Sequence, residues 1–330
     1  FYNTGWSFIS SITTTDVNIE NNICDTTNPT TTGFAPNGRR TNMKGNTIKN
    51  TQSSAITLAQ LSGSQYDTSD SIIEGNIIIN AGIHGISATG HPLNNVIFKG
   101  NLINGTNGGS GEGIALGAIT HQNILIEDNL IQDTDENAIR IISASGIIIR
   151  DITIRGNQIW NCCKNAGLGG SGEFRAGIRL RNAAPTFGEL KNITIENNRI
   201  YDTSGTQLYG LWIQNVVDSF INNNNLYSTT AVSGINTAGT TNSGTVFNMN
   251  PTQSGEPFGT TANMTFSGST SFFGTNIMSG TTAIRGLSGL NWTGVFTSGG
   301  VSGGSGASYS GMIPQGYLNF QVSGNTVKVP

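Results

Sequence analysis

Acidic and basic side chains recur beside short apolar segments of the sequence, at spacings that could bring carboxylates and arginines together. Glu112 precedes the Ile of EGIAL by two positions, and Asp135 and Glu136 precede the first Ile of NAIRI by four and three. The position after that first Ile holds Arg140 and, in AGIRL, Arg179. Hydrolysis of a glycosidic bond uses two carboxylates about 5–10 Å apart, whereas a lyase uses a base and a cation that neutralises the uronate. We therefore expect Glu112 and Glu136 to be the carboxylates, with Asp135 beside them, and the two arginines to hold an acidic sugar.

Two further residues would complete a sugar-binding groove. Trp212 follows the first Leu of YGLWI, where it either stacks on a sugar ring or packs under a loop with Tyr209. Glu173 lies in the insertion CCKNAGLGGSGEFRAG, residues 162–177, and insertions in repeat proteins tend to flank the binding face. The alternative is that these are ordinary polar residues of a solvent-facing strand, since surface Arg–Glu pairs contribute only ~0–1 kcal/mol.

A repeat built around Asn must position these residues. The steps between its copies run from 24 to 41 residues, a period typical of repeat architectures. The Asn column is Asn22, Asn46, Asn76, Asn101, Asn129, Asn157, Asn198 and Asn224.

Each position around the Asn has a structural interpretation. The preceding residue is Gly, Asn or Asp in all eight copies, the types that tolerate a left-handed backbone. Apolar residues three and, in the clearer copies, five positions before the Asn show the period of two typical of a strand. An apolar residue two positions after it begins a second short strand, and a further apolar block follows each unit. Each repeat therefore predicts three short strands and no helix.

The fold predicted is all-β, a right-handed single-stranded parallel β-helix of about eight or more coils. One coil cannot bury its own inner face, whereas stacked coils pair equivalent positions about 4.8 Å apart. The Asn amides would then form a ladder at one corner, each bonded to the next. Leucine-rich repeats and β-propellers are excluded, because there is neither a helix per unit nor long strands with tight hairpins.

Two regions are predicted, the β-helix over residues 1–237 and a Gly/Ser/Thr-rich β region over residues 238–330. The ending GYLNFQVSGNTVKVP alternates apolar and polar residues on both sides of a turn, which predicts a C-terminal hairpin. Such a hairpin would cap the open end of the rod or serve oligomerisation.

Composition excludes several classes of protein. The 330 residues are only 11% charged and the net charge is −3, so a broad basic surface for nucleic acid is not expected. No apolar run approaches the ~20 residues of a membrane span. Three cysteines, two of them adjacent, do not form a disulfide framework, and we expect neither a metal site nor a cofactor. The chain opens at Phe1 without a signal-peptide pattern, which indicates a mature form or a fragment.

The Ile-x-Gly/Asn-Asn-x-Ile coils resemble the right-handed β-helix repeats of the pectate-lyase-like superfamily. Together with the Gly/Ser/Thr-rich tail and its ending, they look most like bacteriophage tailspike and tail-fibre proteins. That resemblance implies a homotrimer that binds, and often cleaves, bacterial surface polysaccharide. It also implies contacts with other virion proteins and a place outside the cell or on the virion surface, after folding in the host cytoplasm. The catalytic motifs of the polygalacturonases and the alginate epimerases, and the calcium-binding Asp column of the pectate lyases, are not present in the sequence.

Three functions remain open at this point. The first is a phage tailspike or tail fibre that recognises host polysaccharide, with or without cleaving it. The second is a secreted polysaccharide lyase or glycoside hydrolase on the same fold. The third is a non-catalytic structural filament or virion decoration protein.

Overall fold

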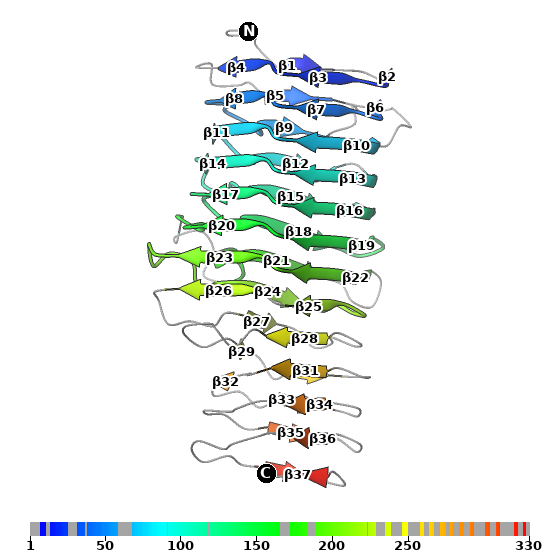
Figure 1. The fold of residues 1–330 in the computed structure, drawn as a ribbon, viewed down its shortest axis with the longest axis vertical. Helices are drawn as coiled ribbons and strands as arrows, with labels where there is room; N and C mark the ends of the chain where they lie inside the picture. Colours follow the sequence, from blue (N-terminus) through cyan, green and yellow to red (C-terminus); the bar gives the residue numbers. More distant parts are fainter. Residues whose placement is uncertain are drawn as a thin grey trace.

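The computed structural model describes residues 7–10, 14–25, 32–36, 38–58, 68–90, 92–117, 119–165, 172–183, 189–222 and 224–228, and beyond these only the short strands between residues 235 and 327. Over these residues the chain is a right-handed parallel β-helix whose strands lie in successive layers (Figure 1). The predicted fold class is confirmed. Among the described residues, no helix is long and apolar enough to cross a membrane.

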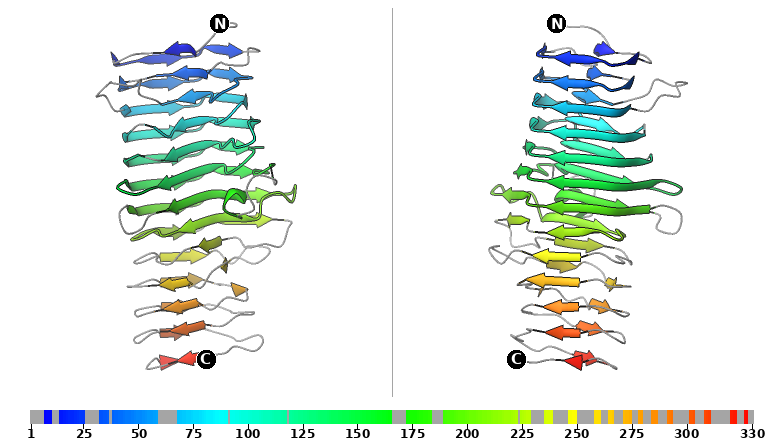
Figure 2. Two further views of the ribbon diagram at one scale, coloured as in Figure 1. Left: turned by 180° about the vertical axis from the view of Figure 1, so that it is seen from behind. Right: turned by 45° about the vertical axis from the view of Figure 1, so that its right-hand side comes forward.

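Three long parallel sheets form the sides of the rod, and each coil passes from sheet D to sheet A and then to sheet B (Figures 1 and 2). Sheet A contains β4 (Ile23–Asp25), β8 (Thr47–Lys49), β11 (Ile77–Ala81), β14 (Leu102–Thr106), β17 (Leu130–Gln132), β20 (Gln158–Trp160), β23 (Arg199–Asp202) and β26 (Asn225–Ser228). Sheet B contains β1 (Ser7–Ser10), β5 (Thr32–Ala35), β9 (Ile56–Thr57), β12 (Ile86–Ala88), β15 (Ile114–Gly117), β18 (Ile139–Ser143), β21 (Ala176–Asn182), β24 (Tyr209–Gln214), β27 (Ile235–Ala238), β29 (Phe258–Thr260) and β32 (Met278–Ser279). Sheet D contains β3 (Asn18–Glu20), β7 (Asn42–Lys44), β10 (Thr68–Glu74), β13 (Leu93–Lys99), β16 (His121–Glu127), β19 (Ile148–Arg155), β22 (Glu189–Glu196), β25 (Phe220–Asn222), β28 (Val246–Met249), β31 (Ser271–Gly274), β34 (Asn291–Thr293), β36 (Ser308–Ser310) and β38 (Thr326–Val327).

Three smaller elements complete the described part of the fold. Sheet C is the pair β2 (Thr14–Thr15) and β6 (Gly38–Arg39). Sheet E contains β30 (Met264–Phe266), β33 (Ile284–Gly286), β35 (Val301–Gly303) and β37 (Phe320–Val322). The single 3-10 helix in the described residues, η1 (Gly172–Arg175), lies in the insertion before β21.

The eight Asn side chains form a hydrogen-bonded ladder at the corner between sheets D and A. From Asn22 to Asn224, the Nδ2 atom of each Asn donates to the Oδ1 atom of the next, at 2.9–3.1 Å. The same Oδ1 atoms also accept from the backbone N–H groups of the preceding Asn residues. The residue before each Asn has φ between 54° and 65° in the seven copies that the structure describes, as the Gly/Asn/Asp column predicts. Asn223, which precedes the last Asn, lies outside the described residues.

A second left-handed column was not predicted. Six positions before each ladder Asn, all eight residues have φ between 47° and 60°. Seven are Asn or Asp and one is Arg40, so the sequence did contain this signal. Neighbouring members bond to one another, as when Asn95 Nδ2 donates to Asp70 Oδ1 at 2.7 Å. Five members, Asp70, Asn95, Asn123, Asp151 and Asn192, lie within strands of sheet D, so the column bends these strands near their beginnings.

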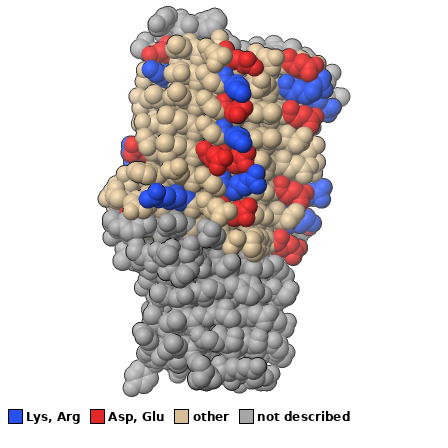
Figure 3. Space-filling view, viewed as in Figure 1, with Lys and Arg blue, Asp and Glu red and all other residues tan. Residues whose placement is uncertain are grey.

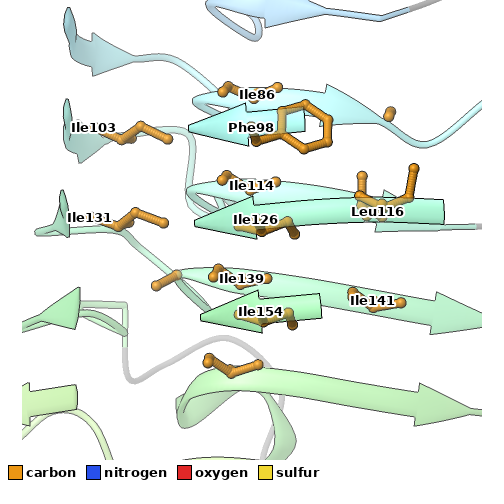
Figure 4. Packing of buried hydrophobic residues seen from close by; sticks show 14 of the residues in the cluster. Ile86, Phe98, Ile103, Ile114, Leu116, Ile126, Ile131, Ile139, Ile141 and Ile154 are labelled. Carbon is orange, nitrogen blue, oxygen red and sulfur yellow. The ribbon is translucent and has the colours of Figure 1, made fainter. Parts of the chain in front are cut away.

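The interior is a stack of aliphatic side chains from all three sheets. Equivalent positions face each other in register, so that Ile86 pairs with Ile114 and Ile114 with Ile139. Full burial of one such side chain stabilises the fold by about 1.5–3 kcal/mol. Figure 4 shows the fully buried Ile103 and Ile131 of sheet A, Ile86, Ile114 and Ile139 of sheet B, and Phe98, Ile126 and Ile154 of sheet D.

Charges of alternating sign run along the outer edge of sheet D, beside the Asn ladder. The column is Glu20, Lys44, Glu74, Lys99, Glu127, Arg155 and Glu196, and it forms the central coloured stripe of Figure 3. Glu127 contacts Lys99 Nζ at 2.9 Å and Arg155 Nη2 at 2.8 Å. Equivalent positions of neighbouring coils lie side by side in a parallel sheet. Because the charges alternate in sign, neighbouring coils attract each other at this column, where like charges would repel.

The C-terminal strands differ from the predicted hairpin. β37 belongs to sheet E, where it pairs with β35, whereas β38 belongs to sheet D, where it pairs with β36. Both pairings are parallel, so β37 and β38 continue the coil pattern and do not pair with each other. Sheets B and D likewise run past residue 237 without a change of strand direction.

Candidate functional site

The predicted site residues gather on sheet B and on the connections that enter it from sheet A. Ala115 pairs with Arg140, Arg140 with Arg179, and Arg179 with Trp212, so the column aligned from the sequence lies in register on four neighbouring strands. The Ile residues that face the core fix this register. Their neighbours must then point away from the core, because successive side chains of a strand alternate.

Glu112 lies at the centre of an ionic cluster and is only 1% exposed. Its Oε2 atom lies 2.6 Å from Nδ1 of His84, and its Oε1 atom lies 2.9 Å from Nε of Arg140. The backbone N–H of Glu112 also points to the same His84 nitrogen, at 3.3 Å. His84 therefore pairs with Glu112, although in the sequence it stands apart from any acidic residue.

Glu136, on the next coil, is the second buried carboxyl group. Its pKa is raised to about 7, first by burial and then by the negative charge of Glu112 and a hydrogen bond to Glu112, while Arg140 and Arg179 oppose the shift. A carboxyl group beside a negative charge holds its own proton more tightly, as closely spaced acids do.

Glu173 joins the cluster from the insertion before β21. Its Oε2 atom lies 2.8 Å from Nη2 of Arg179, and its Oε1 atom lies 3.3 Å from Nη1 of Arg181. Arg179 is 1% exposed, and its guanidinium lies 4.5 Å from the centre of the Phe174 ring. Burial lowers the pKa of Arg179, while Glu173 opposes the shift. Asn137 holds η1 in place by donating to the carbonyl oxygen of Glu173 at 3.1 Å.

Asp135 has a different environment from the other two acids. Its Oδ2 atom accepts from the backbone N–H of Gly109 at 2.7 Å, and its own N–H donates to Thr106 Oγ1 at 2.9 Å. These bonds tie the turn before β18 to the turn of the preceding coil. The Asp135 carboxylate therefore helps to hold these two turns together.

Trp212 packs inside the protein. It is 6% exposed and lies against Tyr209, with ring centres 5.3 Å apart and planes inclined by 60°. Of the two arrangements left open by the sequence, packing is the one observed. Trp212 extends the column of Arg140 and Arg179 without offering its face to a ligand.

The cluster holds more hydrogen-bonding atoms than its described residues use. Both carboxylate oxygens of Glu112, Nε and Nη1 of Arg179, and Nε1 of Trp212 are buried without a hydrogen-bond partner in the part of the chain that the structure describes. The ion pairs of Glu112 are short but poorly aligned for hydrogen bonding. Buried polar atoms are nearly always bonded to protein, water or ligand, so this cluster suits a small polar guest.

A polar hollow lies on the connections between sheets A and B, on coils that include those of His84 and Glu112. It encloses about 360 Å³ and is lined by Asn50, Thr51, Gln52, Asn80, Gly82, Asn107 and Gly108. Asn50 and Asn80 have left-handed φ values, and Asn80 Nδ2 donates to Asn50 Oδ1 at 3.1 Å. Among the described residues, no group of three or more His, Cys, Asp and Glu side chains could hold a metal ion.

Comparison with known proteins yields no family. No protein-family model matches the chain, and no curated protein matches its sequence. Among solved structures, the chain is similar to PfbA, a surface adhesin of Streptococcus pneumoniae, with a TM-score of 0.36 and 11% identity over 95% of this chain and 84% of that one. A likeness this weak carries no argument about function, which must be inferred from the residues.

Proposed function

We propose that this chain is the polysaccharide-recognising β-helix of a tailspike-like or tail-fibre-like virion protein. The observation that carries the proposal is the surplus of buried polar atoms around Glu112 and Arg179 on sheet B. Sugar hydroxyls both donate and accept hydrogen bonds, so they can satisfy a carboxylate and a guanidinium in the same site. A bacterial surface polysaccharide is the ligand class that this chemistry fits.

The partly exposed members of the cluster provide the approach to it. The side chains of His84 and Arg140 are 15% and 21% exposed, and that of Arg181 is 34% exposed. Two arginines and a histidine at the rim favour an acidic sugar, because a guanidinium binds a carboxylate through two parallel hydrogen bonds. In this proposal Arg140 holds the sugar, and the buried Arg179, positioned by Glu173, and Trp212 continue the same column behind it.

The rest of the proposal concerns assembly. The protein would act as a homotrimer, outside the cell or on the virion surface, in contact with other virion proteins. Residues 238–330 would cap the rod or join the three copies. Size-exclusion chromatography with light scattering tests this directly, because a stable trimer is required and a monomer at all concentrations contradicts it.

Glycan binding is tested with an array of bacterial surface polysaccharides, using the wild-type chain and Arg140→Ala. Arg150→Ala is the matched control, because Arg150 is an exposed arginine on sheet D that pairs with Asp151 at 3.6 Å. We expect binding of an acidic polysaccharide that Arg140→Ala weakens and Arg150→Ala leaves unchanged. Equal binding by both variants would refute the site. Absence of all binding would favour the third function, a structural filament or decoration protein.

A second candidate function is a polysaccharide hydrolase or lyase. It is favoured by the pKa of Glu136, which at about 7 suits a general acid at neutral pH. Hydrolysis would use Glu112 and Glu136 as its pair of carboxylates. The test is release of reducing ends or unsaturated products from the bound polysaccharide. Activity that is lost in Glu136→Gln supports this function, and binding without any product excludes it.

A further inference from the structure

The outer face of sheet A carries an aromatic and polar grid that the functions above do not use. Three neighbouring strands place Gln132, Trp160 and Tyr201 in register along one column. The parallel column holds Gln158 and Arg199, also in register. Coils lie about 4.8 Å apart, so the five side chains form one continuous surface.

The two aromatic rings form a shallow stack that remains accessible. Their centres lie 5.9 Å apart, with planes inclined by 31°. Trp160 is 39% exposed, so part of the indole faces solvent. Cross-strand pairing explains why the rings touch. It does not explain why a tryptophan stands on an outer face while Trp212 is packed away.

Arg199 adds a positive charge to the same surface. Its Cζ atom lies 5.2 Å from the centre of the Tyr201 ring, a cation–π contact. No carboxylate of the described residues pairs with Arg199, and Asp133, at the corner after β17, is held by Lys164 at 3.1 Å. A guanidinium stacked on a ring keeps its N–H edge available for an anion.

We propose that Trp160, Tyr201 and Arg199 form a binding platform for an acidic polysaccharide chain that lies against sheet A. A pyranose ring stacks on the indole, a sugar carboxylate meets Arg199, and the amides of Gln132 and Gln158 bond to hydroxyls. Few polar groups converging on aromatic surface are typical of small-molecule and sugar sites. On the next strand, the backbone positions of Asn225 and Tyr227 continue the register of the two columns.

This platform takes the ligand class of the proposed function but uses a different sheet, so the two can fail separately. The probes are uronate-containing bacterial capsular polysaccharides and the same polysaccharides after reduction of their carboxyl groups, measured by titration calorimetry. The variants are Trp160→Ala, Trp160→Tyr and Arg199→Gln. Phe220→Ala is the matched control, because Phe220 is a 37% exposed aromatic residue on sheet D.

We expect Trp160→Ala to weaken binding about tenfold or more. Trp160→Tyr retains a ring and should stay within about threefold of the wild type, and Phe220→Ala should have no effect. Carboxyl reduction and Arg199→Gln should weaken binding to a similar extent and should not add when combined, because they remove the two halves of one contact.

Three outcomes would overturn the platform. The first is that no uronate-containing polysaccharide binds the wild-type chain. The second is that Trp160→Ala binds as well as wild type while Arg140→Ala does not, in which case the sheet B site stands and the platform falls. The third is that Trp160→Ala dissociates an oligomer without changing glycan affinity, which would make this face an interface between copies.

Discussion

The Asn ladder should be a main source of stability, and Asn129→Ala tests this most directly. The Asn129 side chain makes four hydrogen bonds while 1% exposed. Its Nδ2 atom donates to Phe98 O at 3.0 Å and to Asn157 Oδ1 at 2.9 Å. Its Oδ1 atom accepts from the backbone N and from Nδ2 of Asn101, each at 2.9 Å. Alanine removes all four and leaves the Asn101 backbone N–H buried without its acceptor.

The expected loss can be estimated from these bonds. At about 1 kcal/mol of net stability per hydrogen bond, the four bonds amount to about 4 kcal/mol. Asn22 provides the matched control at the end of the ladder. Its Nδ2 donates to Asn46 Oδ1 at 3.1 Å and to Glu20 O at 3.0 Å, in a partly exposed place. Asn22→Ala should therefore cost only about 1–2 kcal/mol.

The assay is guanidinium unfolding followed by far-UV circular dichroism, with stabilities taken from the midpoints and the slope of each transition. The quantity of interest is the difference between the two variants, expected to be about 2–3 kcal/mol. If Asn129→Ala costs no more than Asn22→Ala, the amides of the ladder contribute no more when buried than at its end. The corner would then be held by the left-handed residues and the Ile stack.

Three further perturbations have expected outcomes. The pKa of Glu136 is raised from 4.5 to about 7, so its contribution to stability is present below pH 4.5 and is lost as pH rises through about 7. Glu136→Gln should therefore stabilise the chain above pH 7 and not below pH 4.5. Urea unfolding midpoints measured across this pH range test this. Burial lowers the pKa of His121 to about 4, so its contribution to stability is present above pH 6.5 and is lost as pH falls through about 4. In the Glu136→Gln background, the free energy of unfolding should therefore rise with pH over this range. Glu127→Gln should cost about 1–2 kcal/mol in low salt and clearly less in 1 M salt, since its two ion pairs have exposed partners. Gly113→Ala should destabilise strongly, because a Cβ there would lie 2.5 Å from a backbone oxygen and a side-chain carbon, whereas Gly90→Ala meets nothing within 4 Å and should be neutral in thermal unfolding.

Much of the fold could be predicted because each repeat contains three structural signals at fixed spacing. Apolar residues at a period of two give the inward face, a Gly, Asn or Asp gives the bend, and Asn fills the corner. The column six positions before each Asn shows the same Asn/Asp preference, and it was missed because Arg40 interrupts it and no change of strand marks it. The C-terminal hairpin was wrong for a physical reason. Alternation over Phe320–Val322 and Thr326–Val327 describes strands of either direction and does not identify their partners.

The site residues could be aligned but not oriented from the sequence. Register follows from the buried Ile positions, so the stacking of Arg140 on Arg179 was predictable. The pairing of His84 with Glu112 also follows from register, since each stands two residues before a paired Ile. It was missed because the two residues are 28 positions apart and of different type.

Burial, which decides what these groups can do, depends on the insertion. η1 comes from the longest repeat, and Glu173 and Phe174 cover the buried Arg179 from it. Whether an outward side chain of sheet B meets solvent or protein is therefore determined by a segment with no counterpart in other coils, which periodicity cannot describe. Sheet A has no such cover over Trp160 among the described residues, where the strand is followed directly by a tight turn at Asn161. Trp160 and Trp212, which the strand pattern does not distinguish, thus differ in their exposure to solvent. The exposed one, Trp160, lies beside Arg199, which pairs with no carboxylate of the described residues, and it has the features of a ligand contact.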